Sequence, residues 1–283
     1  MDRVGSEVLP GGFGGIDARA IVDPSAVLGE GVAIGPWSII GPEVELGAGT
    51  VVDAHAIVRG PTRIGERNHI APFASLGDRT PARSYGGEPT TLVVGDDNVF
   101  REGVTVHRGT IQDRGETRIG DRNLFMPYAH VGHDSVVGDH CVFTNNASVS
   151  GHCIVGDHVV LGGYAGVPQY RRIGDHGFVG GMSLVTKDVP AFVRVAGHPA
   201  RALGINVEGL RRRGFDEETI TVLRRAWKLV FRSGRDRLDA LAELRSRPDP
   251  CGHLATFVAS IEAATHGVVR PRGRGATAED GDG

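Results

Sequence analysis

The stretch that decides the fold runs from Ile119 to Val185 and reads IGDRNLFMPYAHVGHDSVVGDHCVFTNNASVSGHCIVGDHVVLGGYAGVPQYRRIGDHGFVGGMSLV. Every sixth residue from its start is a branched aliphatic residue or phenylalanine: Ile119, Phe125, Val131, Val137, Phe143, Val149, Val155, Leu161, Val167, Ile173, Val179 and Val185. The next residue is often Gly, and the fifth position of each hexad is small or β-branched. This period predicts a parallel β-helix, in which each hexad forms one short strand and one turn.

The same period governs the chain before this stretch. From Ile16 to Leu76 the apolar positions keep strict phase. Three hexads close a triangular coil of about 18 residues, and stacked coils bury aliphatic ladders that one coil cannot bury alone. A long run in phase excludes a helical or βαβ interpretation. We therefore expect a mainly β fold, with a β-helix domain over residues 16–200.

Two interruptions break the period. After Leu76 the pattern resumes at Val94, so Gly77 to Val93 is expected to leave the prism as a loop one coil long. A second break, from Gln112 to Arg118, shifts the phase by one residue. Loops that project from a rigid scaffold are the usual place for binding groups.

The two ends of the chain lack the period. Residues 1–15 are glycine-rich at their end and are expected to be a flexible extension. The repeats stop near Val189, and Gly197 to Gly204 is expected to be a short connector into a helical domain over residues 201–269. Asp216 is expected to cap the first of three helices, whose apolar positions are Ile220, Leu223, Trp227, Val230 and Phe231, then Leu238, Leu241 and Leu244, then Leu254, Phe257, Val258 and Ile261. Residues 270–283 are expected to be disordered.

Composition excludes several functional classes. The formal net charge is −3, which gives no reason to expect binding to nucleic acid or to a membrane surface. No apolar run approaches the roughly 18 residues of a membrane span, and no signal peptide is visible. Of the three cysteines, Cys141 and Cys153 occupy the small buried slot of their hexads, and no CxxC occurs. Unpaired buried cysteines suit a reducing compartment, so we expect a cytoplasmic protein.

Histidines are the main candidates for chemistry. His133 and His152 lie 19 positions apart and so fall on one face of adjacent coils, with His130 three residues before His133 and Asp134 directly after it. A histidine beside a carboxylate can serve as a general base, although a structural role remains open from the pattern alone. The His130 and His133 pair could instead hold zinc between subunits, but nothing selects it and no metal is expected. Three other histidines share one turn slot and receive no functional role: His140, His158 and His176.

Four segments together carry a family resemblance. They are REGVTVHRGT (101–110), NLFMPYAHVGHD (123–134), NNA (145–147) with Gly151-His152, and GINVEGLRRRGF (204–215). They resemble the acyl-[acyl-carrier-protein]–UDP-N-acetylglucosamine O-acyltransferases, which catalyse the first step of lipid A synthesis. The similarity extends over roughly residues 16–266, and the last segment separates this family from its N-acyltransferase relatives.

The resemblance implies a fold, an assembly and a reaction. It implies a left-handed β-helix that forms a homotrimer, with active sites in the clefts between neighbouring prisms. The donor would be the phosphopantetheine thioester of acyl carrier protein, with no other cofactor, and the acceptor would be the 3-hydroxyl of UDP-N-acetylglucosamine. His133 would be the general base and Asp134 the acid that orients it. The N–H of Gly151 would donate to the oxyanion.

The resemblance also implies the substrate contacts. Gly181 would leave the acyl groove open for a longer hydroxyacyl chain, and the Arg211–Arg213 cluster suits an acidic carrier protein or a phosphate. The full implied set of substrate-binding residues is His107, His130, His152, Gln169, Gly181, Asn206, Glu208, Arg212 and Arg213.

Three positions depart from the family pattern. Ala82 and Ser84 stand where the family usually carries an acid and a lysine that contact the nucleotide sugar, and Pro168 stands where it has a histidine. Arg79 or Arg83 could replace the lost cation only by a different path. The departures leave three alternatives open: the same reaction with altered contacts, transfer to another nucleotide sugar, or a weakly active relative. A non-catalytic scaffold is a separate alternative. A zinc-dependent hydrolase or lyase of the hexapeptide-repeat type is a further alternative.

Overall fold

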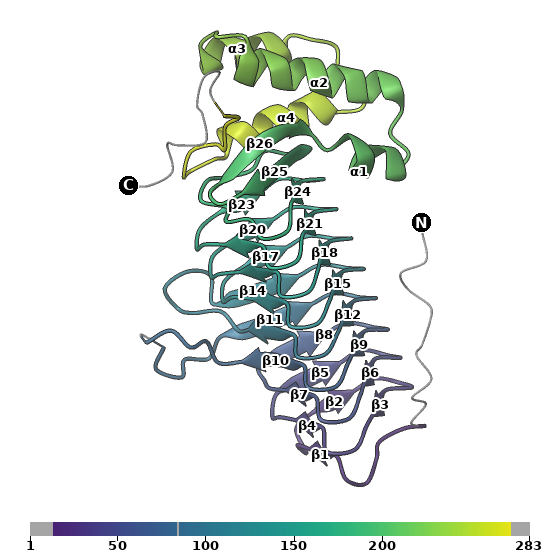
Figure 1. The fold of residues 1–283 in the computed structure, drawn as a ribbon. Helices are drawn as coiled ribbons and strands as arrows, with labels where there is room; N and C mark the ends of the chain where they lie inside the picture. Colours follow the sequence, from purple (N-terminus) through teal and green to yellow (C-terminus); the bar gives the residue numbers. More distant parts are fainter. Residues whose placement is uncertain (1–13, 84, 273–283) are drawn as a thin grey trace.

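The computed structural model describes residues 14–83 and 85–272, which form a three-sided prism of stacked coils with helices at one end (Figure 1). The predicted β-helix followed by a small helical region is confirmed. The predictions for residues 1–13, for Ser84 and for residues 273–283 lie outside the described residues.

Each side of the prism is a sheet whose strands come from successive coils. We name them face 1, face 2 and face 3 in the order in which the chain visits them, and we name each corner by the faces it joins. Face 1 contains β1 (Ile21–Val22), β4 (Ile39–Ile40), β7 (Ile57–Val58), β10 (Ser75–Asp78), β13 (Thr105–His107), β16 (His130–Val131), β19 (Ser148–Val149) and β22 (Gly166–Val167). Face 2 contains β2 (Val27–Leu28), β5 (Val44–Leu46), β8 (Thr62–Ile64), β11 (Thr91–Val94), β14 (Glu116–Ile119), β17 (Val136–Val137), β20 (Ile154–Val155) and β23 (Arg172–Ile173). Face 3 contains β3 (Ala33–Ile34), β6 (Val51–Val52), β9 (His69–Ile70), β12 (Val99–Phe100), β15 (Leu124–Phe125), β18 (Val142–Phe143), β21 (Val160–Leu161), β24 (Phe178–Val179), β25 (Val193–Gly197) and β26 (Ala200–Ile205).

The core is built from the hexad positions. Phe100, Phe125 and Phe143 are fully buried on face 3, and the rings of neighbouring coils lie with centroids 4.9 Å apart. Burial of apolar surface at about 25 cal/mol per Å² supplies the main stabilisation, which only stacked coils can realise. The prediction for Cys141 and Cys153 is also confirmed, since both are buried free thiols and burial raises the pKa of Cys141 to about 12.

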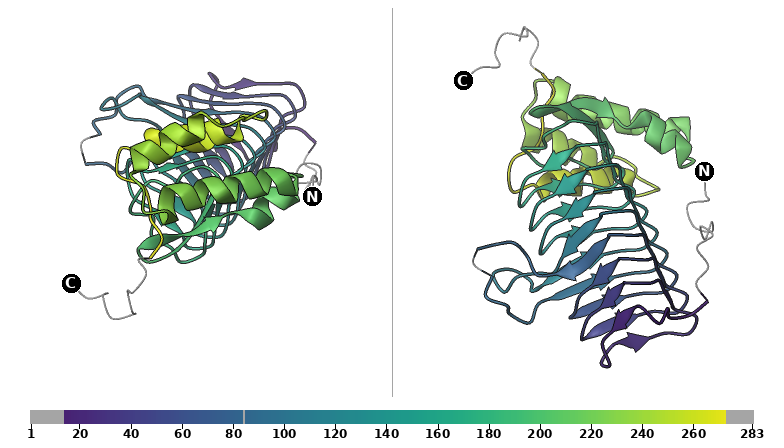
Figure 2. Two further views of the ribbon diagram at one scale, coloured as in Figure 1. Left: turned by 90° about the horizontal axis from the view of Figure 1, so that it is seen from above. Right: turned by 60° about the horizontal axis from the view of Figure 1, so that its bottom comes forward.

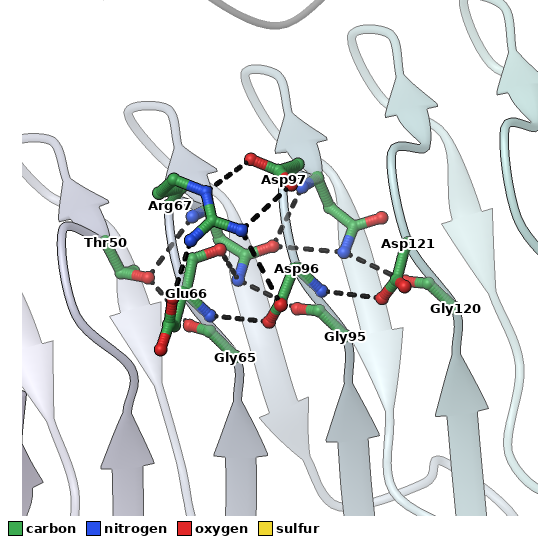
Figure 3. Close-up of polar contacts among 11 residues, drawn as sticks. Thr50, Gly65, Glu66, Arg67, Gly95, Asp96, Asp97, Gly120 and Asp121 are labelled. Atoms are coloured by element: carbon green, nitrogen blue, oxygen red, sulfur yellow. Dashed lines mark hydrogen bonds and ion pairs between the residues drawn. The ribbon is translucent and has the colours of Figure 1, made fainter.

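A polar ladder runs along corner 2–3 (Figure 3). The Oδ1 atom of Asn68 accepts the N–H of Asn98 at 2.9 Å, and the same bond links Asn98 to Asn123 at 2.9 Å. Arg67 reaches across to Asp97 at 2.8 Å. Ladder partners in uninterrupted coils are 18 positions apart, whereas Asn68 and Asn98 are 30 apart and Asn98 and Asn123 are 25 apart. The ladder of hydrogen bonds therefore continues unbroken across both interruptions.

Both interruptions project from corner 1–2, and their bounds differ from those expected. Strand β10 continues to Asp78 and β11 begins at Thr91, so residues 79–90 form the first loop rather than Gly77 to Val93. Strand β14 begins at Glu116, so residues 108–115 form the second loop, and the expectation of a break to Arg118 was wrong. Four residues of β11 pair with four of β14, which draws these flanking residues into face 2. The two loops lie on the same side of the prism (Figure 1).

The end of the prism differs from the expected connector. Residues 200–205 form β26, which pairs antiparallel with β25. Ala200 and Ala202 are buried while Arg201 and Leu203 are exposed, which is the alternation of a strand.

Four helices follow and lie across the end of the prism (Figure 2). They are α1 (Val207–Arg212), α2 (Glu217–Arg232), α3 (Arg237–Arg245) and α4 (His253–Glu262). The three expected helices are confirmed, and the side chain of Asp216 caps α2 by accepting the N–H of Thr219. The short helix α1 was not predicted. Among the described residues, no helix is both long enough and apolar enough to cross a membrane.

Candidate active site

Corner 1–2 gathers most of the residues singled out by the sequence. His133 and Asp134 form the turn between β16 and β17, and Gly151 and His152 form the turn between β19 and β20 on the next coil. Gln169 lies in the turn between β22 and β23, one coil further along. The period places all these turns on one corner because each is a whole number of coils from the others.

His133 and Asp134 form a hydrogen-bonded pair. Nδ1 of His133 lies 2.8 Å from Oδ2 of Asp134, whose side chain is fully buried. Because an ionised carboxylate can only accept, Nδ1 carries the hydrogen and Nε2 is left with its lone pair. Asp134 adopts a left-handed backbone conformation (φ 59°), and its N–H donates to Oγ1 of Thr117 at 2.8 Å. This arrangement orients the imidazole so that Nε2 can accept a proton.

The second loop completes the surroundings of the carboxylate. Thr110 donates its N–H to Asp134 at 2.9 Å and its hydroxyl at 2.6 Å. Burial by itself would raise the pKa of Asp134, but the hydrogen bonds from His133 and Thr110 outweigh it and hold that pKa below its ordinary value. Asp134 is therefore ionised at neutral pH.

Gly151 lies directly against the His133 ring. A Cβ atom at this position would fall 2.6 Å from both Nε2 and Cε1 of His133, so only glycine allows the ring to occupy this place. Within residues 14–83 and 85–272, the N–H of Gly151 donates no hydrogen bond. That N–H is therefore free to donate to a substrate oxygen beside Nε2.

His152 has a partner that the sequence analysis missed. Its Nδ1 lies 2.8 Å from Oδ2 of Asp113, an exposed residue of the second loop. Its ring meets His133 edge-on at 4.7 Å and stacks on Tyr170 at 4.4 Å. The only available signal for Asp113 was an acid inside a loop that enters this corner.

His107 and His130 stand beside this group. Their rings meet edge-on at 5.1 Å, and Nδ1 of His130 lies 2.8 Å from Oγ1 of Thr105. Burial, followed by the neighbouring His107 and His133, lowers the pKa of His130 to about 4. Burial also lowers the pKa of His107, although Asp78 opposes the effect. Both rings are therefore neutral near pH 7 and offer hydrogen bonds rather than charge.

One set of side chains could also hold a metal ion. Potential ligand atoms of His133, Asp134 and His152 lie within 4.8 Å of one another. This set does not include His130, which the sequence analysis paired with His133 as possible zinc ligands. Nδ1 of His130 is instead bonded to Thr105. Asp134 already accepts hydrogen bonds from Thr110 and His133, which a metal would have to displace.

Gly181 lies on a different corner. It follows β24 on corner 3–1, next to the exposed Met182, and a Cβ atom there would meet the carbonyl oxygen of Gly163 at 3.2 Å. Within one chain, the structure does not bring Gly181 to the corner of His133.

The residues around α1 lie on the third corner. Asn206 is buried, caps α1, and donates from Nδ2 to the carbonyl of His176 at 3.0 Å. Arg213 donates to the carbonyl of His158 at 2.9 Å. Glu208 is exposed and pairs with Arg211 at 3.2 Å, and Arg212 is exposed. The predicted site residues are thus divided among all three corners.

The two described departures lie on corner 1–2. Ala82 is part of the first loop, and its N–H donates to Oγ1 of Thr80 at 3.3 Å. Pro168 precedes Gln169, and its carbonyl lies 3.2 Å from Sγ of Cys153. Both changes therefore lie on the same corner as His133.

Comparison with known proteins identifies related sequences. Residues 188–269 match the family model described as UDP N-acetylglucosamine O-acyltransferase, domain 2, and residues 116–151 match the bacterial transferase hexapeptide model. The chain is 55% identical over 255 residues to the acyl-[acyl-carrier-protein]–UDP-N-acetylglucosamine O-acyltransferase of Saccharophagus degradans, covering 90% of this chain and 99% of that one. The enzyme of the same name from Stutzerimonas stutzeri is 53% identical with the same coverage.

Solved structures give the same result. The crystal structure of UDP-N-acetylglucosamine O-acyltransferase (LpxA) from Moraxella catarrhalis superposes with a TM-score of 0.88 at 46% identity, covering 90% of this chain and 99% of that one. The Francisella novicida UDP-N-acetylglucosamine acyltransferase gives a TM-score of 0.87 at 33% identity, covering 90% and 94%. This chain belongs to the acyl-[acyl-carrier-protein]–UDP-N-acetylglucosamine O-acyltransferase family.

Proposed function

We propose that this protein transfers a 3-hydroxyacyl chain from acyl carrier protein to the 3-hydroxyl of UDP-N-acetylglucosamine, the first step of lipid A synthesis. The observation that carries the proposal is the His133–Asp134 pair beside the open N–H of Gly151. Relatives that are more than 50% identical to this chain, and that align with it over nearly their whole length, are named for this activity.

The proposed chemistry gives each of these groups a role. Nε2 of His133 takes the proton of the sugar 3-hydroxyl while that oxygen attacks the thioester carbonyl. Asp134 holds the imidazole and stabilises the imidazolium that forms, and the N–H of Gly151 donates to the oxyanion. When the tetrahedral intermediate collapses, the C–S bond breaks and the imidazolium returns its proton to the leaving thiolate. The products are the acylated sugar and the free thiol of the carrier, and no further cofactor is needed.

The remaining predicted residues would position the substrates. We assign His107, His130, His152 and Gln169 to the sugar and the acyl group on corner 1–2. Gly181 would leave space for a long acyl chain, because each CH₂ buried is worth about 0.8 kcal/mol. Glu208 and Arg212 would contact the nucleotide directly. Asn206 and Arg213 would act mainly by holding α1 against the prism, as their hydrogen bonds to the backbone suggest.

The division of these residues among three corners supports a homotrimer. If corner 1–2 of one prism faces a neighbour that presents Gly181 and α1, a complete site forms between two chains. Such a contact joins two different surfaces, so it is satisfied in every chain only if the chains form a closed ring. A ring of three chains is the smallest of this kind. We further propose a β-helix domain over residues 16–200 and a mainly helical domain over 201–269, with β26 pairing to β25 across the boundary. The free cysteines suit a cytoplasmic location.

A second candidate is acyl transfer to a different nucleotide sugar. It is favoured by Ala82 and Pro168, which lie on the corner of His133, and by Ser84. An assay with 3-hydroxyacyl carrier protein and a panel of UDP-sugars separates the two. Fastest turnover with UDP-N-acetylglucosamine supports the first proposal, and preference for another sugar supports the second. The absence of any acylated sugar would refute both.

A zinc-dependent hydrolase or lyase is the candidate from another class. The cluster of His133, Asp134 and His152 is the observation that favours it. Elemental analysis of the purified protein tests it, together with an assay after dialysis against a chelator. One zinc per chain with activity lost on chelation would overturn the acyltransferase mechanism above.

A further inference from the structure

A cavity lies on the same corner as the catalytic pair. It has a volume of about 460 Å³ and is lined by Pro42, Arg59, Gly60, Asp78, Arg79 and Arg108. These residues come from four successive coils, in the turn after β4, the turn after β7, the end of β10 and the residue after β13. Arg108 directly follows His107, so the cavity adjoins the histidine cluster.

The lining carries three guanidinium groups and one carboxylate. Nε of Arg59 lies 3.5 Å from Oδ2 of Asp78, a long contact between exposed side chains. Within the described part of the chain, neither Arg79 nor Arg108 forms an ion pair. The cavity therefore has an excess of positive charge that its own residues do not balance.

Arg108 is held in place from two directions. Its Nη1 donates to the carbonyl of Gly60, and its Nη2 lies 3.5 Å from the hydroxyl of Tyr85 in the first loop. Its Nε is buried and has no hydrogen-bond acceptor among the described residues. A buried donor without an acceptor is costly, which suggests that a ligand supplies one.

We propose that Arg59, Arg79 and Arg108 form a binding site for a phosphoryl group of one of the two substrates, next to the acyl-transfer centre. Guanidinium groups match the oxygens of a phosphate geometrically and bind it with paired charge-assisted hydrogen bonds. The inference rests on the proposed function, since it assigns the phosphate to a substrate of that reaction. The phosphate can come from the diphosphate of the nucleotide sugar or from the phosphodiester of the carrier's phosphopantetheine arm.

The site would also compensate for a departure from the family pattern. The family usually carries a lysine in the first loop, where this chain has Ser84. Arg79 lies at the start of the same loop, and the Tyr85 contact of Arg108 ties the loop to the cavity. The cation lost from the loop would thus be replaced by arginines of the prism corner.

The test is steady-state kinetics of the R59A/R79A double variant of the full-length protein, with each substrate varied in turn. Both side chains are exposed, so the fold should remain intact, and thermal unfolding checks this. We expect KM to rise about tenfold or more for one substrate, with kcat within about twofold, as for loss of charge-assisted hydrogen bonds. A rise for the UDP-sugar assigns the site to the nucleotide, and a rise for the acyl carrier assigns it to the phosphopantetheine arm. The matched control is R63A, which removes an exposed arginine of β8 outside the cavity lining.

A binding measurement separates this inference from the proposed reaction. Calorimetric titration of the wild type with inorganic pyrophosphate should give a dissociation constant that the double variant weakens about tenfold or more. Equal pyrophosphate affinity in the two proteins, with both KM values unchanged within twofold, would overturn the inference even if acyl transfer is normal. Conversely, inactivity of the wild type towards every UDP-sugar would refute the function while leaving pyrophosphate binding as a test of the cavity.

Discussion

Corners 2–3 and 1–2 both carry several histidines in tight turns, and the surroundings of these histidines differ completely. On corner 2–3, His140, His158 and His176 stack face to face at 4.8 and 4.7 Å, and Phe192 extends the stack at 5.4 Å. On corner 1–2, His133 and His152 meet edge-on, and each bonds a carboxylate. The repeat therefore accepts a histidine as a flat stacking ring, and it becomes a candidate base only where a carboxylate meets its ring nitrogen.

The difference arises from what each corner does with its acids. On corner 2–3 the carboxylate of Asp157 accepts the N–H of Asp139, and that of Asp175 accepts the N–H of Asp157. These acids are used by the ladder and are not bonded to the histidine rings. On corner 1–2 the second loop places Thr110 against Asp134 and Asp113 against His152. The carboxylates of this corner therefore bond the histidine rings.

The largest expected effect is on the reactive corner. H133A should lower kcat by about 10²–10⁴, the usual contribution of a general base, because Nε2 is lost. The matched substitution H158A on the stacked corner should leave kcat within about threefold. Steady-state assays of the two variants test this. If H133A retains activity within threefold of the wild type, His133 is only another turn residue.

The next effect concerns the space beside His133. G151A should reduce kcat/KM by about 10²-fold, because the new methyl group overlaps the imidazole and displaces Nε2. G166A is the control, since a Cβ there has its nearest neighbour, Leu184, at an ordinary 3.6 Å. A G151A enzyme with normal kcat/KM and an unshifted pH–rate profile would show that the ring need not lie where this structure has it.

The stacked histidines of corner 2–3 should affect folding stability at acid pH rather than catalysis. Burial, followed by His158, Arg213 and His253, lowers the pKa of His176 to about 3. The unfolded chain binds this proton from about pH 6.5 downwards, so folding stability is fully present above pH 6.5 and falls as the pH drops towards 3. The loss attributable to His176 between pH 7 and pH 5 should be about 1 kcal/mol, given its partial exposure.

H176F tests this directly, because phenylalanine already occupies the equivalent turn at Phe192. Urea unfolding at pH 7 and pH 5 should show a smaller acid-induced loss in H176F than in the wild type. H140F, which changes the exposed end of the stack, serves as the control. Equal acid-induced losses in H176F and wild type would show that the stack does not sense pH through His176.

The smallest effect refines the reactive corner. D113A should lower kcat/KM about fivefold, since it removes an exposed partner worth ~1 kcal/mol from His152. D113N should recover most of the loss, because its amide oxygen can still accept from Nδ1. R114A, in the same loop, is the control. If D113A equals wild type in both kcat and KM, the contact to His152 has no role in positioning.

The sequence predicted the fold well because the hexad period is a direct record of inward-facing side chains. The same arithmetic brought His133, Gly151 and His152 to one corner. It could not find the contact between Asp113 and His152, since the path of residues 108–115 follows no period. Residues 200–204 were expected to lie in a connector, whereas antiparallel pairing with β25 makes them part of a strand.

The ladder partners that stand 30 and 25 positions apart have a consequence for how such enzymes diversify. Stacking of the coils depends on which hexads pair, and not on the number of residues between them. Loop residues can therefore be added to or removed from corner 1–2 while His133 stays in place. Residues 79–90 should therefore be exchangeable, whereas residues 108–115 are constrained because Thr110 donates to Asp134 and Asp113 bonds His152. Grafting the first loop of a relative between Asp78 and Thr91 would then transfer acceptor preference without rebuilding the catalytic pair.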